Sequence, residues 1–149
     1  MAMGTVTRQP VVITVSGSAQ TRSHLARILR PAGFRVIERS DATQIASLAL
    51  HEPSLVVLDA SESLVRTLGD CRMLVLASQA PVLVLLGTAS ERAEVMCFNA
   101  GAADVVLARA SAALLLARAR AAIGQAKPFM NSSELSVGPL RLERWSRRL

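Results

Sequence analysis

Aromatic residues and cysteines are scarce in this sequence. It has no tyrosine, three phenylalanines and a single tryptophan, Trp145, so the aromatic side chains that stack on a flavin are missing. Cys71 and Cys97 are too few and too far apart for a disulfide framework or a zinc site, and we expect two reduced, partly buried thiols. His24 and His51 have no second His or Cys at ligand spacing. These absences predict a protein without a metal site or a bound cofactor.

Long hydrophobic runs are also absent. A membrane helix needs about 20 apolar residues, and the longest candidate, residues 73–86, is interrupted by Ser78, Gln79 and Pro81. The N-terminus lacks the charged-then-apolar design of a signal peptide. The 149 residues, of which 51% are hydrophobic, are enough for one globular domain with a tail. We therefore expect a cytoplasmic protein with no membrane partner.

Positive charge exceeds negative charge, with a net charge of +6 carried by 16 arginines and one lysine. The final nine residues hold four of these arginines, Arg141, Arg144, Arg147 and Arg148. A basic end of this kind indicates either a nucleic-acid partner or a solvated tail, and charge alone does not separate the two.

Five apolar, strand-like runs alternate with five helix-like runs. The expected strands are residues 11–15, 34–37, 55–58, 82–86 and 104–107. The expected helices are residues 19–29, 63–77, 90–100 and 111–123, and one that Ser40 or Asp41 caps and that runs to about residue 50. Repeated alternation with short loops predicts an α/β protein with a (βα)5 doubly wound parallel sheet of strand order 2-1-3-4-5.

The apolar run of residues 55–58 ends on one carboxylate, Asp59. An unbroken apolar strand is typical of a parallel sheet that is buried on both faces, and ligands bind beyond the carboxyl ends of such strands. The predicted strand order gathers six residues at one crevice: Ser16, Gly17, Asp59, Leu86, Gly87 and Ala108. Asp59 is then either a reactive group or a carboxylate that caps a helix or anchors a loop.

Four segments, in the right order, resemble the response regulators of bacteria. PSLVVLDASES (53–63) resembles the phospho-acceptor strand of their receiver domain, and AGAADVVL (100–107) resembles its AGADDYL segment. LLLARARAAI (114–123) is similar to the last receiver helix of the OmpR/PhoB subfamily. LSVGPLRLERWSRRL (135–149) resembles the opening strand of that subfamily's winged-helix DNA-binding domain. The resemblance implies a receiver domain of flavodoxin-like topology over residues 11–123, with Asp59 at the phospho-acceptor position.

The positions that support phosphorylation in that family differ here. The acidic pair that holds Mg²⁺ falls on Ser16 and Gly17, the phosphate-binding Thr or Ser on Leu86, and the phosphate-pairing lysine on Ala108. Phosphoryl transfer depends on positioning and on charge neutralisation, so these departures predict an unphosphorylated Asp59 and no Mg²⁺ site.

Arg109, next to the lysine position, is a candidate substitute for the missing lysine. Adjacent residues of a strand point to opposite faces, however, which argues against this substitution.

The resemblance also implies a two-fold dimer face formed by the fourth helix, the fifth strand and the fifth helix. Asp104, Arg118 and Arg120 match charged positions of that face, whereas Leu114 replaces an acidic position and Glu94 a basic one. Leu114 and Arg118 are four residues apart and share a helix face. An apolar patch with a charged rim predicts a homodimer, although Leu114 could instead pack under the following linker.

The expected organisation is a leader (1–10), a receiver-like domain (11–124), a linker (125–133) and the beginning of a winged-helix domain (134–149) of which the chain holds only this part. We expect an atypical, phosphorylation-independent receiver of a DNA-binding transcription regulator, which acts as a homodimer and meets DNA through its C-terminal domain. A histidine kinase or another regulator protein is a further candidate partner. No Ser-His-Asp or Cys-His arrangement is visible, so we expect no enzymatic activity.

Three alternatives remain open. The chain could be a protein-interaction module without a DNA role, or a conventional receiver that is phosphorylated on Asp59. It could also be a flavodoxin-like binder of an anion or nucleotide, which the loop of residues 15–21 would hold at a helix N-terminus. Ser18 acting as a plain helix N-cap explains that loop equally well.

Overall fold

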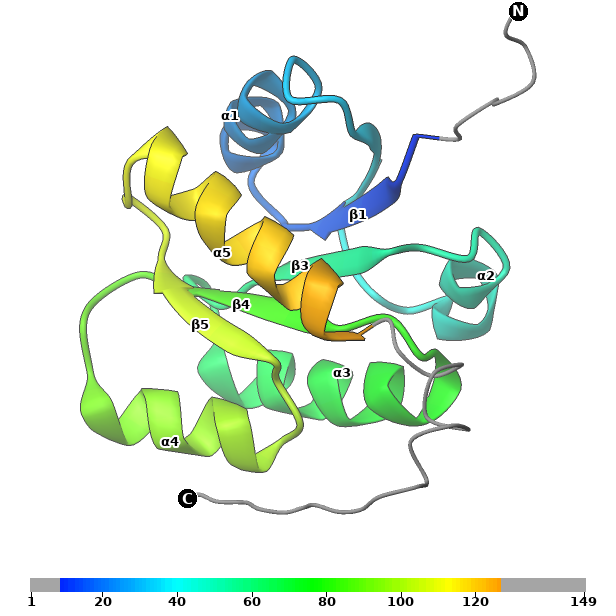
Figure 1. The fold of residues 1–149 in the computed structure, drawn as a ribbon. Coiled ribbons are helices and arrows are strands. Elements are labelled where there is room, and N and C mark those ends of the chain that lie inside the picture. Colours follow the sequence, from blue (N-terminus) through cyan, green and yellow to red (C-terminus); the bar gives the residue numbers. More distant parts are fainter. Residues whose placement is uncertain (1–8, 127–149) are drawn as a thin grey trace, which may run out of the picture.

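A five-stranded parallel sheet forms the centre of the computed structural model, which describes residues 9–126 (Figure 1). The strands are β1 (Val11–Val15), β2 (Arg35–Arg39), β3 (Leu55–Asp59), β4 (Val82–Leu86) and β5 (Asp104–Leu107). Their order is β2-β1-β3-β4-β5 and every neighbouring pair is parallel, which confirms the predicted topology. Most of the expected leader, most of the expected linker, the beginning of the second domain and the four terminal arginines lie outside the described residues.

Helices cover both faces of the sheet. The helices α1 (Ala19–Leu29) and α5 (Ala112–Ala126) lie on one face. On the other face lie α2 (Ile45–Ala49), α3 (Leu64–Ala77) and α4 (Glu91–Asn99). In Figure 1 the first pair lies above the sheet, and α3 and α4 lie below it.

The position of the central strands between two layers of helices explains why their sequences are apolar without interruption. Side chains of β3 alternate between two cores: Val56 and Leu58 pack on the α2–α4 side, whereas Leu55 and Val57 pack on the α1–α5 side. All residues of β4 are buried. Burial on both faces requires apolar residues at successive positions, which is the pattern of the sequence.

Serine side chains begin four of the helices. The hydroxyls of Ser18, Ser63, Ser90 and Ser111 accept hydrogen bonds from backbone N–H groups three residues later, at 3.1–3.2 Å. Each bond satisfies a donor that the first turn leaves unpaired. The N-cap interpretation of Ser18 is therefore confirmed.

Helix α4 ends directly before Gly101, in agreement with the expected helix over residues 90–100. Gly101 has a φ of +106°, and a Cβ atom placed on it would lie 2.8 Å from Cγ2 of Val75 in α3. Both the left-handed backbone and the close approach of α3 require glycine at this position.

Several element boundaries differ from the prediction. The second helix begins at Ile45, after Gln44, and not directly after a cap at Ser40 or Asp41, and β2 runs from Arg35 to Arg39 instead of over 34–37. Asp41 does not cap α2, because its carboxylate accepts from the backbone N–H of Thr43 at 3.0 Å and from its hydroxyl at 2.7 Å. This local turn competes with the helix.

The last helix, α5, continues to Ala126, three residues past its expected end, so the first two residues of the expected linker are helical. Gly124 costs only about 1 kcal/mol inside a helix, and the preceding alanine-rich turns support it. None of the helices described over residues 9–126 is long and apolar enough to cross a membrane.

Thr14, in the middle of β1, is fully buried, and its Oγ1 has no hydrogen-bond partner among the described residues. We predict that Thr14→Val raises the free energy of unfolding by about 1 kcal/mol, because the cost of burying an unpaired hydroxyl disappears. Urea denaturation measures this. Thr67→Val is the matched control, because the buried Thr67 hydroxyl donates to the Asp59 carbonyl at 3.4 Å and no gain is expected. Equal gains in both variants would contradict the argument.

Candidate functional site

A small cavity of about 50 Å³ lies at the carboxyl ends of β1 and β3. Residues that follow β1, β2 and β3 line it together with the first two turns of α3. Three of the six predicted crevice residues, Ser16, Gly17 and Asp59, are among them. The strand order therefore brings together the part of the predicted site that follows β1 and β3.

Both carboxylate oxygens of Asp59 already accept hydrogen bonds. Oδ2 accepts from the Ser16 hydroxyl at 2.7 Å, and Oδ1 accepts from the Ser61 backbone N–H at 3.0 Å and from the Ser61 hydroxyl. The carboxylate thus ties the end of β1 to the loop between β3 and α3. This geometry agrees with the loop-anchoring alternative for Asp59.

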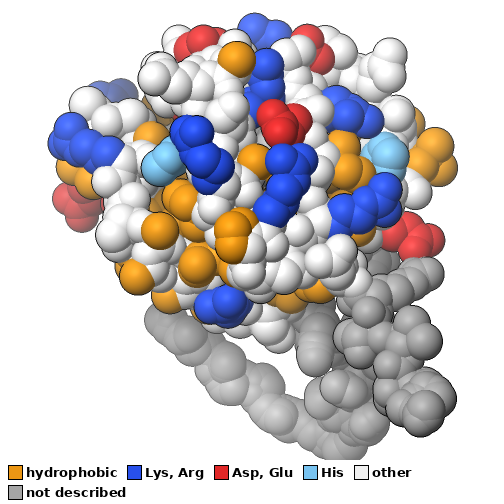
Figure 2. All heavy atoms as spheres, turned by 90° about the horizontal axis from the view of Figure 1, so that it is seen from above, with side chains coloured by type: hydrophobic (Ala, Val, Ile, Leu, Met, Phe, Trp, Pro, Cys, Tyr) orange, Lys and Arg blue, Asp and Glu red, His pale blue; other side chains and the backbone are white. Residues whose placement is uncertain are grey.

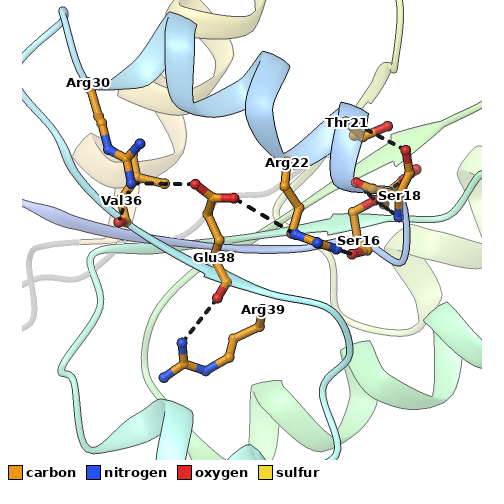
Figure 3. A network of polar contacts seen from close by, with 9 residues as sticks. Ser16, Ser18, Thr21, Arg22, Arg30, Val36, Glu38 and Arg39 are labelled. Atoms are coloured by element: carbon orange, nitrogen blue, oxygen red, sulfur yellow. Dashed lines mark hydrogen bonds and ion pairs between the residues drawn. The ribbon is translucent and has the colours of Figure 1, made fainter.

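Ser16 is itself fixed in place (Figure 3). It is almost fully buried, and its Oγ accepts from the backbone N–H of Ser18 at 3.0 Å. Its carbonyl accepts from the Arg22 guanidinium at 2.6 Å, and its own N–H donates to the Arg39 carbonyl at 3.0 Å. Ser16 is therefore a rigid donor to Asp59.

Glu38 of β2 connects Arg22 of α1 with Arg30, which directly follows α1, as Figure 3 shows. Its carboxylate lies 3.8 Å from Nε of Arg22 and 3.5 Å from Arg30. The sequence alone does not reveal this network, because the network depends on the pairing of β1 with β2, which places Glu38 beside Thr14. Partly exposed ion pairs contribute little stability, so its effect is to orient Arg22 over the β1–α1 loop.

Glu62 is a second acid that sequence reasoning did not single out. A Cβ atom on Gly17 would lie 2.5 Å from Oε1 of Glu62, so this carboxylate lies against the backbone where the family carries an acidic side chain. Asp41 and Asp70 line the same cavity. Glu62 lies three residues after Asp59 in the quoted segment, but only the loop conformation directs it toward Gly17.

Two of these acids have shifted pKa values. Partial burial raises the pKa of Asp70, whereas the hydrogen bonds from Thr43 lower the pKa of Asp41. Within residues 9–126, no three His, Cys, Asp or Glu side chains are grouped so as to hold a metal ion.

The remaining predicted crevice residues do not line the cavity. The Leu86 side chain is buried in the core, and the Ala108 N–H donates to the Leu86 carbonyl at 2.8 Å. Gly87 faces Ser61, because a Cβ atom placed on Gly87 would lie 3.5 Å from the Cβ of Ser61. Arg109 is exposed and is not among the cavity-lining residues.

Four of the predicted dimer residues, Glu94, Asp104, Leu114 and Arg118, lie on the α4–β5–α5 side, whereas the fifth, Arg120, lies elsewhere. Nη1 of Arg118 lies 3.1 Å from Oδ2 and 3.3 Å from Oδ1 of Asp104, so these residues pair within one chain. Leu114 is 43% exposed, and Glu94 is exposed on α4. Arg120 instead lines a hollow with residues that follow α1, on the other flank of α5. Arg118 and Arg120 are two residues apart, and residues at this spacing on a helix do not share a face, so the sequence alone could have predicted that they lie on different sides of α5.

No family model matches the sequence, and no protein with a curated description is similar to it. Solved structures are similar. A response regulator from Thermotoga maritima is 26% identical, and the match covers 78% of this chain and 99% of the other with a TM-score of 0.70. The fold of these residues is that of a response-regulator receiver domain.

Two further similar structures agree with this fold. The signal receiver domain of an HD domain-containing protein from Pseudomonas fluorescens Pf-5 is 20% identical, covering 90% of this chain and 98% of the other, with a TM-score of 0.73. A response regulator from Burkholderia pseudomallei, solved with a phosphorylated aspartic acid, a calcium ion and citrate, is 19% identical. That match covers 89% of this chain and 77% of the other, with a TM-score of 0.67.

The cavity does not fit the divalent cation that the family resemblance implies. Mg²⁺ requires oxygen ligands in near-octahedral geometry. The Ser16 hydroxyl directs its proton to Asp59 and Gly17 supplies no side chain, so Asp59 and Glu62 are the acids nearest the implied position. Four acids line the cavity, but within residues 9–126 no three of them are grouped so as to hold a metal ion.

Both thiols of the receiver domain lie away from the cavity. Cys71 in α3 and Cys97 in α4 are fully buried in the same core. Burial, with a smaller contribution from Cys97, raises the pKa of Cys71 from 9.0 to about 11. Burial also raises the pKa of Cys97. The thiols are therefore protonated at neutral pH and are not nucleophiles.

We predict that the free energy of unfolding falls as the pH rises from 9 to 11. In this range the unfolded chain releases the Cys71 proton while the folded domain retains it, so the unfolded state binds fewer protons and rising pH favours it. The chain has no tyrosine and one lysine, so few other groups titrate here. Urea denaturation at several pH values tests this. A Cys71→Ala/Cys97→Ala variant with the same pH dependence would show the thiols to be irrelevant.

Proposed function

We propose that this protein is a phosphorylation-independent receiver domain of a DNA-binding transcription regulator and that it acts as a homodimer. The observation that carries the proposal is the state of Asp59. Both oxygens of its carboxylate serve as acceptors for Ser16 and Ser61, so the residue is a structural anchor.

The charges around Asp59 also oppose its phosphorylation. A phosphoryl group would add negative charge to a cavity that Asp41, Glu62 and Asp70 line, and Arg66 is the one cation among the described lining residues. Transfer would also break at least one hydrogen bond to the carboxylate. Catalysis of phosphoryl transfer relies on neutralising such charge, and the expected metal and lysine positions do not provide it.

Dimerisation through the α4–β5–α5 face is supported by exposed apolar side chains. Val95 and Met96 of α4 and Leu114 of α5 are 51%, 36% and 43% exposed. Full burial of an exposed side chain of this kind contributes about 1.5–3 kcal/mol, and covering these half-exposed ones contributes roughly half of that each. The Asp104–Arg118 pair beside them would fix the register of the two copies more than their affinity.

The DNA-binding role is supported by residues 135–149, whose sequence resembles the opening of a winged-helix domain. A permanent dimer would then place two DNA-binding domains on adjacent half-sites. Reading the gene beyond codon 149 tests this part, and a stop codon there would remove its support. The proposal includes no enzymatic activity and no cofactor.

A protein-interaction module without a DNA role is the second candidate. It is favoured by exposed apolar side chains on α3, where Val65, Val75 and Leu76 are 79%, 42% and 83% exposed. This surface lies outside the α4–β5–α5 face and would suit a different protein, such as another regulator or a kinase.

We predict that Asp59 gains no phosphoryl group from acetyl phosphate and Mg²⁺. Intact-mass measurement after incubation should show the unmodified chain, because the carboxylate is hydrogen-bonded and surrounded by acids. Asp59→Asn is the control for modification elsewhere. A stoichiometric gain that Asp59→Asn abolishes would establish the conventional receiver instead.

We predict that Leu114→Glu and Arg118→Glu shift the protein from dimer to monomer without unfolding it. Leu114→Glu places a charge in the apolar contact, and Arg118→Glu sets two carboxylates against each other at Asp104. Analytical ultracentrifugation at micromolar concentration measures the change. Arg27→Glu, an exposed residue of α1, is the control that should remain dimeric. A monomeric wild type would refute the dimer, and a dimer insensitive to both changes would refute this face.

A further inference from the structure

The acids of the described residues are absent from α1 and α5, whereas arginines occur on both faces of the sheet. The helices α1 and α5 contain no Asp or Glu, and their arginines are Arg22, Arg27, Arg118 and Arg120, with Arg30 directly after α1. Most of the described acids lie elsewhere: Asp41, Asp59, Glu62 and Asp70 line the cavity at the carboxyl edge, and Glu91 and Glu94 lie in the first turn of α4 beside Arg92. Figure 2, which looks onto the α1–α5 side, shows basic side chains distributed over it.

Neighbouring acids compensate only part of this positive charge. Glu38 is shared between Arg22 and Arg30, and Asp104 pairs with Arg118. Arg27 and Arg120 form no ion pair with the described residues, and both are exposed. The α1–α5 face therefore keeps an excess of guanidinium groups on two rigid, adjacent helices.

The same face exposes fewer large hydrophobic side chains than α3 and α4 do, although an apolar hollow lined by Phe34 and Ile123 lies beside Arg120. Nine large hydrophobic side chains are exposed among the described residues, and seven of them lie on α3 and α4. Helix α1 has none, and α5 has only Leu114. Protein interfaces are centred on buried aromatic and aliphatic anchors, whereas nucleic-acid interfaces are polar and strongly positive.

We propose that the α1–α5 face binds the sugar-phosphate backbone of DNA, with Arg27 and Arg120 as its principal phosphate contacts. Arginine forms directional, charge-assisted hydrogen bonds to phosphate oxygens. Contacts to phosphate oxygens carry no sequence information, so binding through these two guanidinium groups is independent of sequence. The inference goes beyond the proposed function, because it assigns a DNA contact to the receiver domain itself and not to the C-terminal segment.

The test uses the full 149-residue chain and a fluorescein-labelled DNA duplex of arbitrary sequence. Fluorescence anisotropy gives the dissociation constant between about 50 and 200 mM salt, a range in which phosphate contacts weaken steeply. We expect Arg27→Glu/Arg120→Glu to weaken binding at least about tenfold and to reduce the salt slope by about one for each lost contact. Both side chains are exposed, so circular dichroism should show an unchanged fold.

Two matched variants make the result specific to this face. Arg72→Glu/Arg92→Glu makes the same charge change at exposed positions of α3 and α4 and should bind DNA like the wild type. Neutralising Arg141, Arg144, Arg147 and Arg148 to Gln measures the contribution of the C-terminal segment.

Four outcomes would overturn the proposal. The first is a wild type that does not bind the duplex, the second is an equal loss of affinity in both double-Glu variants, and the third is a loss of affinity in the C-terminal variant alone. The fourth outcome is that a polyglutamate peptide competes as well as unlabelled DNA, which would indicate an acidic protein partner. Retained binding in the C-terminal variant together with loss in Arg27→Glu/Arg120→Glu would support the proposal even if no winged-helix domain follows.

Discussion

Burial of the central strands on both faces is the constraint on which the rest of this structure depends. Because β3 and β4 contact helices above and below, every side chain along them is apolar until the strand reaches the edge of the sheet. Polar chemistry is then confined to the carboxyl ends of the strands and to the loops that follow. Asp59, Ser16 and Ser61 lie there, and their hydrogen bonds connect the two central β–α units.

The site differs from that of a phosphorylated receiver in the groups that surround the aspartate carboxylate. A receiver that accepts a phosphoryl group needs an aspartate whose negative charge is balanced by a metal and a cation. Here two serine hydroxyls and a backbone N–H donate to the aspartate, and three further acids and Arg66 line the same cavity. Internal hydrogen bonds thus satisfy the carboxylate oxygens of Asp59 in this structure.

The sequence predicted the sheet because two-sided burial leaves an unbroken apolar pattern, and it predicted the helix starts because serine hydroxyls satisfy N–H groups locally. It failed for the beginning of α2, where the turn at Asp41 competes with the helix over only a few residues. In the site, Asp59 could be recognised from the strand that it ends. Glu62 and the Arg22–Glu38 pair could not be recognised, because their positions depend on loop conformation and on strand pairing.

The serine caps have a consequence for the acids of the cavity. Four helices, α1, α3, α4 and α5, begin at the carboxyl edge of the sheet, and each N-terminus carries about half an elementary positive charge. A serine hydroxyl pairs one N–H group but brings no negative charge to the macrodipole. Glu62 directly precedes the Ser63 cap of α3 and Asp59 lies at the same edge, so these two carboxylates are placed to act as counter-charges to the α3 dipole. Carboxylates at this edge of the sheet therefore have an electrostatic role that requires neither a phosphoryl group nor a metal.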